Sequence, residues 1–307
     1  MDFRHLPFCA AIISAAAGAA ETSAAKRPSI SGIASVVLYS HDPGRSRAYY
    51  RDYLGYAESR PTCFSVNERQ EIELRAELTT GSDRLCRIGL LTSDAEAMRQ
   101  FLHAHGHLVP AALDRTPAGE RSFTVSDPDG HLIEFIEPPA QARAATVRAL
   151  VLPPTRVATR IRHAGFMVAD LGASLRFYQD LLGFSETWRG SADDTVLSWV
   201  NLKVPEGDEY LELMLYDPAS PPDADRRGVL NHLCLEVDDA IASEKILRAR
   251  ALPPGCKPIA AMKIGRNGKR QINGYDPDGT RTEIMEVTTF DGKPVPTSAA
   301  PLPHHRK

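Results

Sequence analysis

Residues 175–184 read Leu-Arg-Phe-Tyr-Gln-Asp-Leu-Leu-Gly-Phe, and residues 47–56 read Arg-Ala-Tyr-Tyr-Arg-Asp-Tyr-Leu-Gly-Tyr. Both segments place two aromatic residues, an Asp, a Leu-Gly pair and a final aromatic residue in the same order. In the later segment Phe177, Leu181 and Leu182 recur at helical spacing, and Gly183 is typical of a residue that ends a helix. Such a repeat predicts two copies of one domain.

A second repeated motif supports the duplication. Asp127-Pro128-Asp129-Gly130 precedes Glu134, and Asp276-Pro277-Asp278-Gly279 precedes Glu283. Each tetrapeptide predicts a turn, because Pro restricts φ and Gly accepts positive φ. The residues after the second turn, 282–287, read as a strand. Both motifs therefore occur once in each half, in the same order.

Each half also repeats within itself. Residues 231–239, Asn-His-Leu-Cys-Leu-Glu-Val-Asp-Asp, predict a strand that leads into a helix over 240–251, and they imitate residues 163–171. Residues 87–94 fill the same place in the first half. The chain therefore predicts an α+β fold of four strand–helix–strands modules, two in each domain. The expected boundaries are 30–138 for the first domain, 139–159 for a linker, 160–289 for the second domain and 290–307 for a disordered tail.

The N-terminal residues 1–24 predict a secretory signal peptide. Arg4 precedes an apolar stretch over 6–20 that ends in small residues, although Asp2 weakens the basic start. A disordered Ala-rich tail or a misplaced start codon is the alternative. The prediction is export to the periplasm or the extracellular space. Four cysteines then remain, with no Cys-x-x-Cys spacing, and we interpret them as free thiols, although an exported protein permits disulfides: Cys63, Cys86, Cys234 and Cys256.

The overall composition is that of a globular protein. Of the 307 residues, 43% are hydrophobic and 24% are charged, and the net charge of -3 gives no reason to expect nucleic acid as a partner. No apolar run of about 18 residues occurs beyond the N-terminus, so we expect no membrane-spanning helix. A monomer and a homodimer are both compatible with the sequence.

The strand with His163, the helix end at 178–183, the segment 231–239 and the turn before Glu283 together resemble the vicinal-oxygen-chelate superfamily, which includes glyoxalases, bleomycin resistance proteins and extradiol dioxygenases. The resemblance covers roughly residues 32–137 and 160–288. In that family two βαβββ modules form a cupped mixed sheet around one divalent metal ion, with ligands on the first and last strand of each module. The resemblance implies four ligands here: His163, Glu212, His232 and Glu283.

Imidazole and carboxylate ligands together suit nickel, zinc, iron, manganese or cobalt. In an octahedral shell they leave two positions open for two neighbouring oxygens of a small-molecule substrate. Each residue also has an ordinary structural interpretation: a His on a strand is commonly a hydrogen-bonded core residue, and Glu212 could face water. Glu286 is excluded as a ligand because it lies three positions after Glu283, on the opposite strand face.

The first domain departs from the ligand pattern. Ser35 occupies the place of His163, since 163 minus 128 is 35, and Arg87 occupies the place of His232. Glu134 corresponds to Glu283, and Glu73 is a candidate for the residue that corresponds to Glu212. We therefore expect a degenerate first domain without a metal, and a single site formed by the third and fourth modules.

The complete ligand set resembles that of the glyoxalase I and acyl-CoA epimerase branches. The resemblance implies a metal-dependent lyase or isomerase acting on a small carbonyl compound through a chelated enediolate, with Glu283 or Glu212 as the catalytic base. An extradiol dioxygenase using His163, His232 and Glu283 for iron is the alternative, but Asn273 occupies the place of that branch's Tyr and no His occurs from 233 to 303. A metal-free small-molecule binding or resistance protein is the third reading, and a metal-dependent antibiotic-modifying transferase the fourth.

Overall fold

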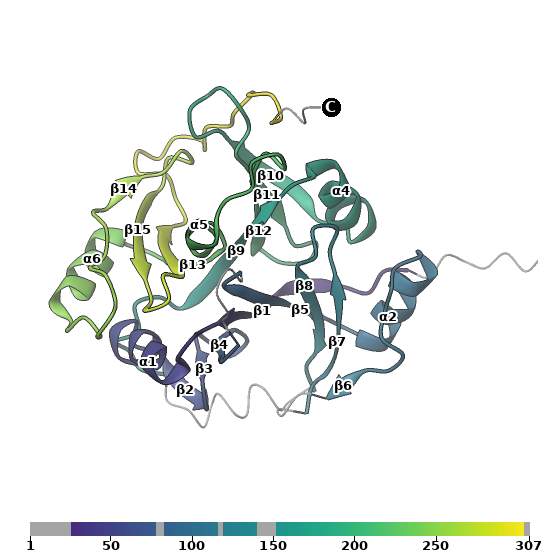
Figure 1. The fold of residues 1–307 in the computed structure, drawn as a ribbon, viewed down its shortest axis with the longest axis horizontal. Coiled ribbons are helices and arrows are strands. Elements are labelled where there is room, and N and C mark those ends of the chain that lie inside the picture. The colour runs from purple at the N-terminus through teal and green to yellow at the C-terminus, as the bar shows by residue number, and fades with distance from the viewer. Residues whose placement is uncertain (1–25, 78–82, 116–118, 140–151, 304–307) are drawn as a thin grey trace, which may run out of the picture.

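Two curled, mixed eight-stranded sheets form the protein, one from each half of the chain (Figure 1). The computed structural model describes residues 26–77, 83–115, 119–139 and 152–303, so the expected signal peptide over 1–24 lies outside the described residues. The first sheet has the order β2-β3-β4-β1-β5-β8-β7-β6 and contains β1 (Ile30–Tyr39), β2 (Ala57–Arg60), β3 (Cys63–Ser65), β4 (Glu71–Arg75), β5 (Leu85–Thr92), β6 (Asp114–Arg115), β7 (Arg121–Ser126) and β8 (Leu132–Glu137).

The second sheet repeats this order as β10-β11-β12-β9-β13-β16-β15-β14. Its strands are β9 (Arg160–Val168), β10 (Ser185–Gly190), β11 (Trp199–Lys203), β12 (Tyr210–Leu215), β13 (His232–Val237), β14 (Lys263–Ile264), β15 (Arg270–Tyr275) and β16 (Arg281–Glu286). The helical segments are α1 (Pro43–Ala48), η1 (Tyr49–Tyr53), α2 (Ala95–Ala104), α4 (Leu171–Leu175), η2 (Arg176–Leu181), α5 (Ala224–Leu230) and α6 (Ala240–Ala249).

Each sheet consists of two βαβββ modules joined at its centre. The first strands of the two modules, β9 and β13, pair antiparallel, and the last strand of each module pairs parallel with its own first strand. The first sheet repeats these pairings with β1, β4, β5 and β8. This confirms the α+β fold of tandem cupped domains, and it places the third and fourth modules in one sheet.

The aromatic repeat forms a short helix that widens toward its end. Asp170 begins α4 by accepting a hydrogen bond from the backbone N–H of Ala173. In η2 the backbone bonds join residues five apart, as from Leu182 to Phe177, and Gly183 follows with a φ of +76°. The helix therefore stops at the glycine, as the sequence predicts.

The two repeated motifs contact each other across the domains. The hydroxyl of Tyr50, in η1 of the first module, donates to Asp276 Oδ2 in the turn of the fourth module at 3.0 Å. The hydroxyl of Tyr178, in η2, donates to Asp127 Oδ2 in the turn of the second module at 2.8 Å. In Figure 1 α1 accordingly lies beside the second sheet, and α4 beside β7 and β8. Each helix thus covers a turn of the other domain.

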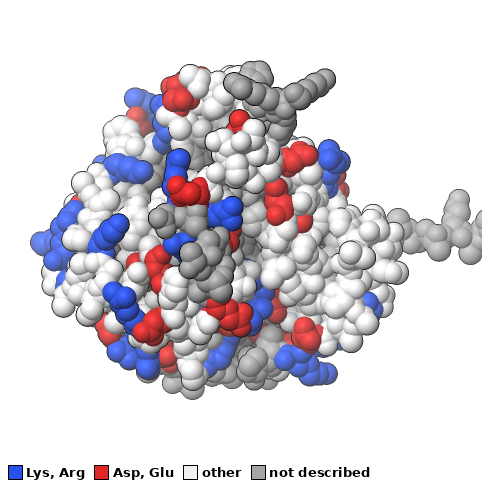
Figure 2. All heavy atoms as spheres, in the orientation of Figure 1, with Lys and Arg blue, Asp and Glu red and all other residues white. Residues whose placement is uncertain are grey.

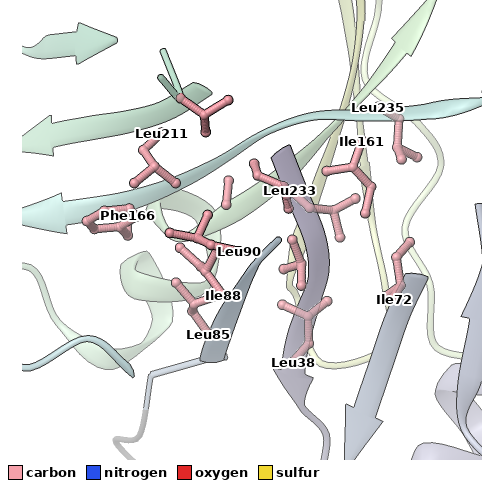
Figure 3. Close-up of a cluster of buried hydrophobic side chains, with 14 of the residues drawn as sticks. Leu38, Ile72, Leu85, Ile88, Leu90, Ile161, Phe166, Leu211, Leu233 and Leu235 are labelled. Carbon is pink, nitrogen blue, oxygen red and sulfur yellow. The ribbon is translucent and has the colours of Figure 1, made fainter. Parts of the chain in front are cut away.

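One hydrophobic core extends through both domains. Figure 3 shows Leu38 and Ile88 of the first sheet close to Ile161, Phe166 and Leu233 of the second, all of them buried. Burial of this apolar area is the main free-energy term that holds the two sheets together. Because the core lies between the sheets, their other faces remain available for sites.

The C-terminal segment packs against the protein, although its sequence predicts disorder. Residues 290–307 are rich in proline and predict disorder, but residues 290–303 lie against the second domain; 304–307 lie outside the described residues. The carbonyl of Pro296 accepts from Trp188 Nε1 at 2.6 Å, and that of Pro301 accepts from the backbone N–H of Leu197 at 2.7 Å. Proline lacks a donor but keeps its carbonyl acceptor, so it can satisfy polar groups of a sheet edge.

The surface carries both signs of charge. Figure 2 shows acidic and basic side chains interspersed over the visible face. No helix among the described residues has the length and apolar character needed to cross a membrane. Cys63, Cys86 and Cys234 are buried free thiols, and Cys256 is a half-buried one.

Burial of Asp276 makes the domain contact sensitive to pH. Burial raises the pKa of this carboxyl to about 7, although hydrogen bonds from Thr280 and Tyr50 oppose the shift. The folded pKa lies above the unfolded value near 3.9, so the stabilisation is complete below that value and is lost as pH rises through about 7. Relative to an Asp276→Asn variant, the wild type should lose about 1.4 kcal/mol of unfolding free energy between about pH 6 and about pH 8.

Denaturant unfolding of metal-free protein at the two pH values measures this difference. Asp180→Asn, at an exposed position of η2, is the control and should track the wild type. Parallel stability curves for the wild type and Asp276→Asn would contradict the buried, protonated carboxyl.

Candidate metal centre

The four candidate ligands lie on the four central strands of the second sheet. His163 is on β9, Glu212 on β12, His232 on β13 and Glu283 on β16, which are the first and last strands of the third and fourth modules. All four side chains are buried. The structure thus brings together every ligand that the sequence predicts.

The strand register explains why they meet. Gly165 pairs with Glu212 on one side and with His232 on the other. Cys234 likewise pairs with His163 and with Glu283. On β9 the paired residues 163 and 165 lie two positions apart, and so do 232 and 234 on β13. Side chains two positions apart on a strand point to the same face of the sheet, so all four ligands share one face. The ligands are therefore related by an approximate two-fold symmetry between the modules.

Their donor atoms are spaced like the ligands of one metal ion. His163 Nε2 lies 3.1 Å from His232 Nε2 and 3.5 Å from Glu283 Oε2, and Glu212 Oε2 lies 3.5 Å from His232 Nε2. All four donor atoms lie within 4.8 Å of one another. Ligands about 2.1 Å from a metal are about 3.0 Å apart at neighbouring octahedral positions and about 3.4 Å apart in a tetrahedron. The donor set and its spacing fit a divalent transition metal.

The protonation states suit metal binding. Burial lowers the pKa of His232 to about 3, with the Arg281 guanidinium adding to the effect, so the imidazole is neutral and its lone pair is free at neutral pH. Burial would raise the pKa of Glu283, but His163, His232 and Arg281 outweigh it and hold that pKa well below its usual range. Burial raises the pKa of Glu212, and the Glu283 carboxylate adds to this while His163 opposes it. A dication would compensate both buried carboxylates.

Backbone contacts orient His232. Its Nδ1 lies 2.7 Å from the carbonyl oxygen of Leu230, which would accept the Nδ1 proton when Nε2 binds a metal ion. The imidazole lies over Gly165: a Cβ at that position would be 2.1 Å from His232 Cε1. The absence of a side chain at Gly165 is therefore a requirement of the site.

A cavity of about 190 Å³ opens onto the carboxylate ligands. Its walls come mainly from β10, β11, β14 and the segment that follows β14, and include Trp188, Trp199, Met214, Lys263, Ile264, Gly265, Arg266, Asn267, Gln271 and Arg281. The segments near 187–195 and 262–270, which we expect from the sequence to form pocket walls, contribute Trp188 and residues 263–267, whereas Trp199, Met214, Gln271 and Arg281 are recognised only once the neighbouring strands are known. Within the described parts of the chain, no His or Tyr lines this cavity.

Neighbouring polar residues have separate roles. Glu286 lies outside the ligand group: its Oε1 accepts from the backbone N–H of Ala240 at the start of α6 at 3.0 Å, and Oε2 accepts from Arg270. This agrees with the sequence argument that Glu286 faces away from the site.

Asn201 and Asn273 pair in register with Glu212 and Glu283, and both amides are buried. Asn201 and Asn273 thus hold equivalent positions in the two modules, each on the strand next to a carboxylate ligand.

The first domain lacks both histidine ligands, and an arginine occupies the place of one of them. By register Ser35, Glu73, Arg87 and Glu134 occupy the places of the four ligands. Arg87 Nε lies 2.8 Å from Glu134 Oε2, so a guanidinium provides the positive charge beside that carboxylate. Among the described residues of this domain, no three His, Cys, Asp or Glu side chains converge as the four ligands do.

Comparison with known proteins agrees with this architecture. The model of the Glyoxalase/Bleomycin resistance protein/Dioxygenase superfamily matches residues 32–135 and 160–284. A search of curated proteins found no match.

Several solved structures share the fold. A variant of homoprotocatechuate 2,3-dioxygenase from B. fuscum is similar with a TM-score of 0.63 and 18% identity, over 89% of this chain and 76% of that one. The native homoprotocatechuate 2,3-dioxygenase from Arthrobacter globiformis has a TM-score of 0.63 and 16% identity, over 89% and 86% of the two chains. The Mn(II)-bound glyoxalase from Novosphingobium aromaticivorans has a TM-score of 0.61 and 17% identity, over 90% and 89%.

At these identities the solved structures show the fold alone. The family match covers most of both domains, in the same two segments that form the cupped sheets. The chain therefore belongs to the Glyoxalase/Bleomycin resistance protein/Dioxygenase superfamily.

Proposed function

We propose that this protein is a divalent-metal-dependent enzyme of the glyoxalase type, a lyase or isomerase that moves a proton within a small carbonyl compound. The observation that carries the proposal is the convergence of two imidazoles and two carboxylates in one buried group on the floor of a cavity. Four protein ligands leave room in an octahedral shell for two neighbouring oxygens of a substrate. A bound dication would act as a Lewis acid that stabilises negative charge on those oxygens.

The chain's own residues would handle the proton. Glu212 and Glu283 both line the cavity, on opposite sides of the two imidazoles. A carboxylate at the cavity wall can take a proton from a carbon next to a carbonyl and return it to the neighbouring carbon. His163 and His232 would keep their places, since both are buried and, unlike the carboxylates, neither lines the cavity. We assign the base role to Glu283 or Glu212.

An extradiol dioxygenase is the second candidate. The similarity to homoprotocatechuate 2,3-dioxygenases over the length of both domains supports it, as does the subset His163, His232 and Glu283, which has the composition of a two-His-one-carboxylate iron site. The cavity lining opposes it, because the described residues that form it include no His or Tyr to act as acid and base. In the sequence, Asn273 takes the place of the Tyr that the dioxygenase branch carries. Export to the periplasm or beyond stays a prediction, and it would restrict either enzyme to substrates found there.

Metal analysis and two assays test the proposal. We expect untagged protein to contain one divalent ion, and the loaded protein to isomerise 2-oxoaldehyde hemithioacetals without consuming oxygen. Of Glu283→Gln and Glu212→Gln, the variant that lacks the base should lose about 10²–10⁴-fold in turnover, the usual contribution of a general base. Oxygen uptake with a catechol by the iron-loaded protein would instead establish the dioxygenase. Protein that binds no metal even after reconstitution would contradict both and leave a metal-free binding protein.

A further inference from the structure

The cavity above the metal centre has two chemically different walls. On one side the rings of Trp188 and Trp199 stack with their centroids 6.3 Å apart and their planes 20° apart, and Met214 lies beside them. On the other side lie Lys263, Arg266 and Arg281. Indole faces suit a planar or apolar body, and the basic groups suit a negative charge.

The basic wall carries charge that ion pairs neutralise only in part. Arg266 forms an ion pair with Asp194 at 3.0 Å. For Lys263 and Arg281, no carboxylate within the described parts of the chain lies at ion-pair distance. Glu212 and Glu283, the two carboxylates that line the cavity, are the candidate metal ligands, and a dication would compensate their charge.

The position of Arg281 points to the same conclusion. One of its terminal nitrogens lies 2.8 Å from His232 Nδ1, which would carry the ring proton and donate it to the carbonyl of Leu230 when Nε2 binds a metal ion. Two donors would then face each other there, and Arg281 Nε is buried with no hydrogen-bond partner among the described residues. A guanidinium placed in this way lacks an acceptor, and an anionic group in the cavity would supply one.

The first domain provides an internal comparison. Its corresponding cavity, of about 270 Å³, also contains arginines, but they lie against acidic partners: Arg60 forms two hydrogen bonds with Glu71, Arg75 donates to Glu73, and Arg87 lies beside Glu134. Three of the four arginines in the lining of this cavity, which has no metal ligand set, are thus paired with carboxylates. Uncompensated positive charge occurs in the cavity that also holds the candidate ligands.

We propose that the substrate of this cavity is an aryl carboxylate: a small planar compound whose ring lies against Trp188 and Trp199 and whose carboxylate binds Arg281 and Lys263. This inference rests on the proposed function, since the metal would hold the reacting oxygens of the same molecule. The volume of about 190 Å³ accommodates one ring with its substituents. The carboxylate binds the basic wall, so it remains outside the reaction and determines specificity.

The tryptophans allow a direct test, because Trp188 and Trp199 are the two tryptophans of the whole chain. Quenching of intrinsic tryptophan fluorescence therefore reports on this cavity. The probes are benzoate and benzamide, which have the same shape and differ in charge. We expect benzoate to bind metal-loaded protein about tenfold more tightly than benzamide, and added salt to reduce the difference.

A charge-matched pair of variants locates the carboxylate. Lys263→Gln removes an exposed cavity lysine, and Lys245→Gln removes an exposed lysine on α6, outside the cavity. Benzoate should bind Lys263→Gln about three- to tenfold more weakly, and Lys245→Gln unchanged. Equal affinity for benzoate and benzamide, or benzoate binding unaffected by Lys263→Gln, would overturn the proposal; the latter would place the carboxylate on the metal. Metal content, measured on the same samples, shows separately whether the proposed function fails.

Discussion

A His163→Ala, His232→Ala double variant is expected to purify without bound metal, where the wild type carries one divalent ion. The two imidazoles supply both nitrogen donors of the group, and their Nε2 atoms lie 3.1 Å apart. Without them Glu212 and Glu283 face each other as two carboxylates, an oxygen-only pair that suits neither nickel nor zinc. Elemental analysis of untagged proteins measures the difference, before and after incubation with metal.

Thermal unfolding provides an independent measure of the same site. A ligand that binds the native state stabilises it by about 2.7 kcal/mol at a hundred times its Kd, so added metal should raise the Tm of the wild type and leave that of the double variant unchanged. His103→Ala, His105→Ala is the control, because both residues are exposed at the end of α2, away from the site. Metal content in the double variant equal to that of the control would show that the ion binds elsewhere.

A Gly165→Ala variant is expected to fold and yet to bind metal about 10–100-fold more weakly, the loss that is usual when ligand orientation is disturbed. Gly165 is not a ligand. A Cβ there would lie 2.1 Å from His232 Cε1 and 2.5 Å from His232 Nδ1, so the imidazole must move. β9 cannot move instead, because it is hydrogen-bonded to β12 and β13 on both sides.

Metal titration of the apoprotein, together with circular dichroism, measures the effect of Gly165→Ala. Crowding in the interior should cost about 1–3 kcal/mol of stability while the spectrum stays native. The matched control is Gly172→Ala in α4, where a Cβ would meet nothing closer than 3.3 Å and where alanine favours the helix. Native metal affinity in Gly165→Ala would mean that His232 binds in another orientation, or that it is not a ligand.

Local patterns in the sequence contained most of the fold. The repeats at 47–56 and 175–184 identified the duplication, the family resemblance implied the four ligands, and the alternation of side chains along the last strand placed Glu286 on the face opposite Glu283. These features depend on neighbours a few residues apart, where helical and strand geometry alone determine direction. The replacement of a histidine by Arg87 in the first domain could also be predicted, because the repeats align Arg87 with His232.

Contacts between distant segments were decided by the tertiary structure. The bond from Tyr50 to Asp276, the packing of Pro296 and Pro301 against the second domain, and the two walls of the cavity join residues far apart in the chain. So does the contact between Gly165 and the His232 ring. The sequence by itself determined which side chains share a strand face. Which strands then became neighbours, and how closely their side chains approached, depended on the packing of the whole core, because non-local pairing is selected by total burial and hydrogen bonding rather than by any local motif.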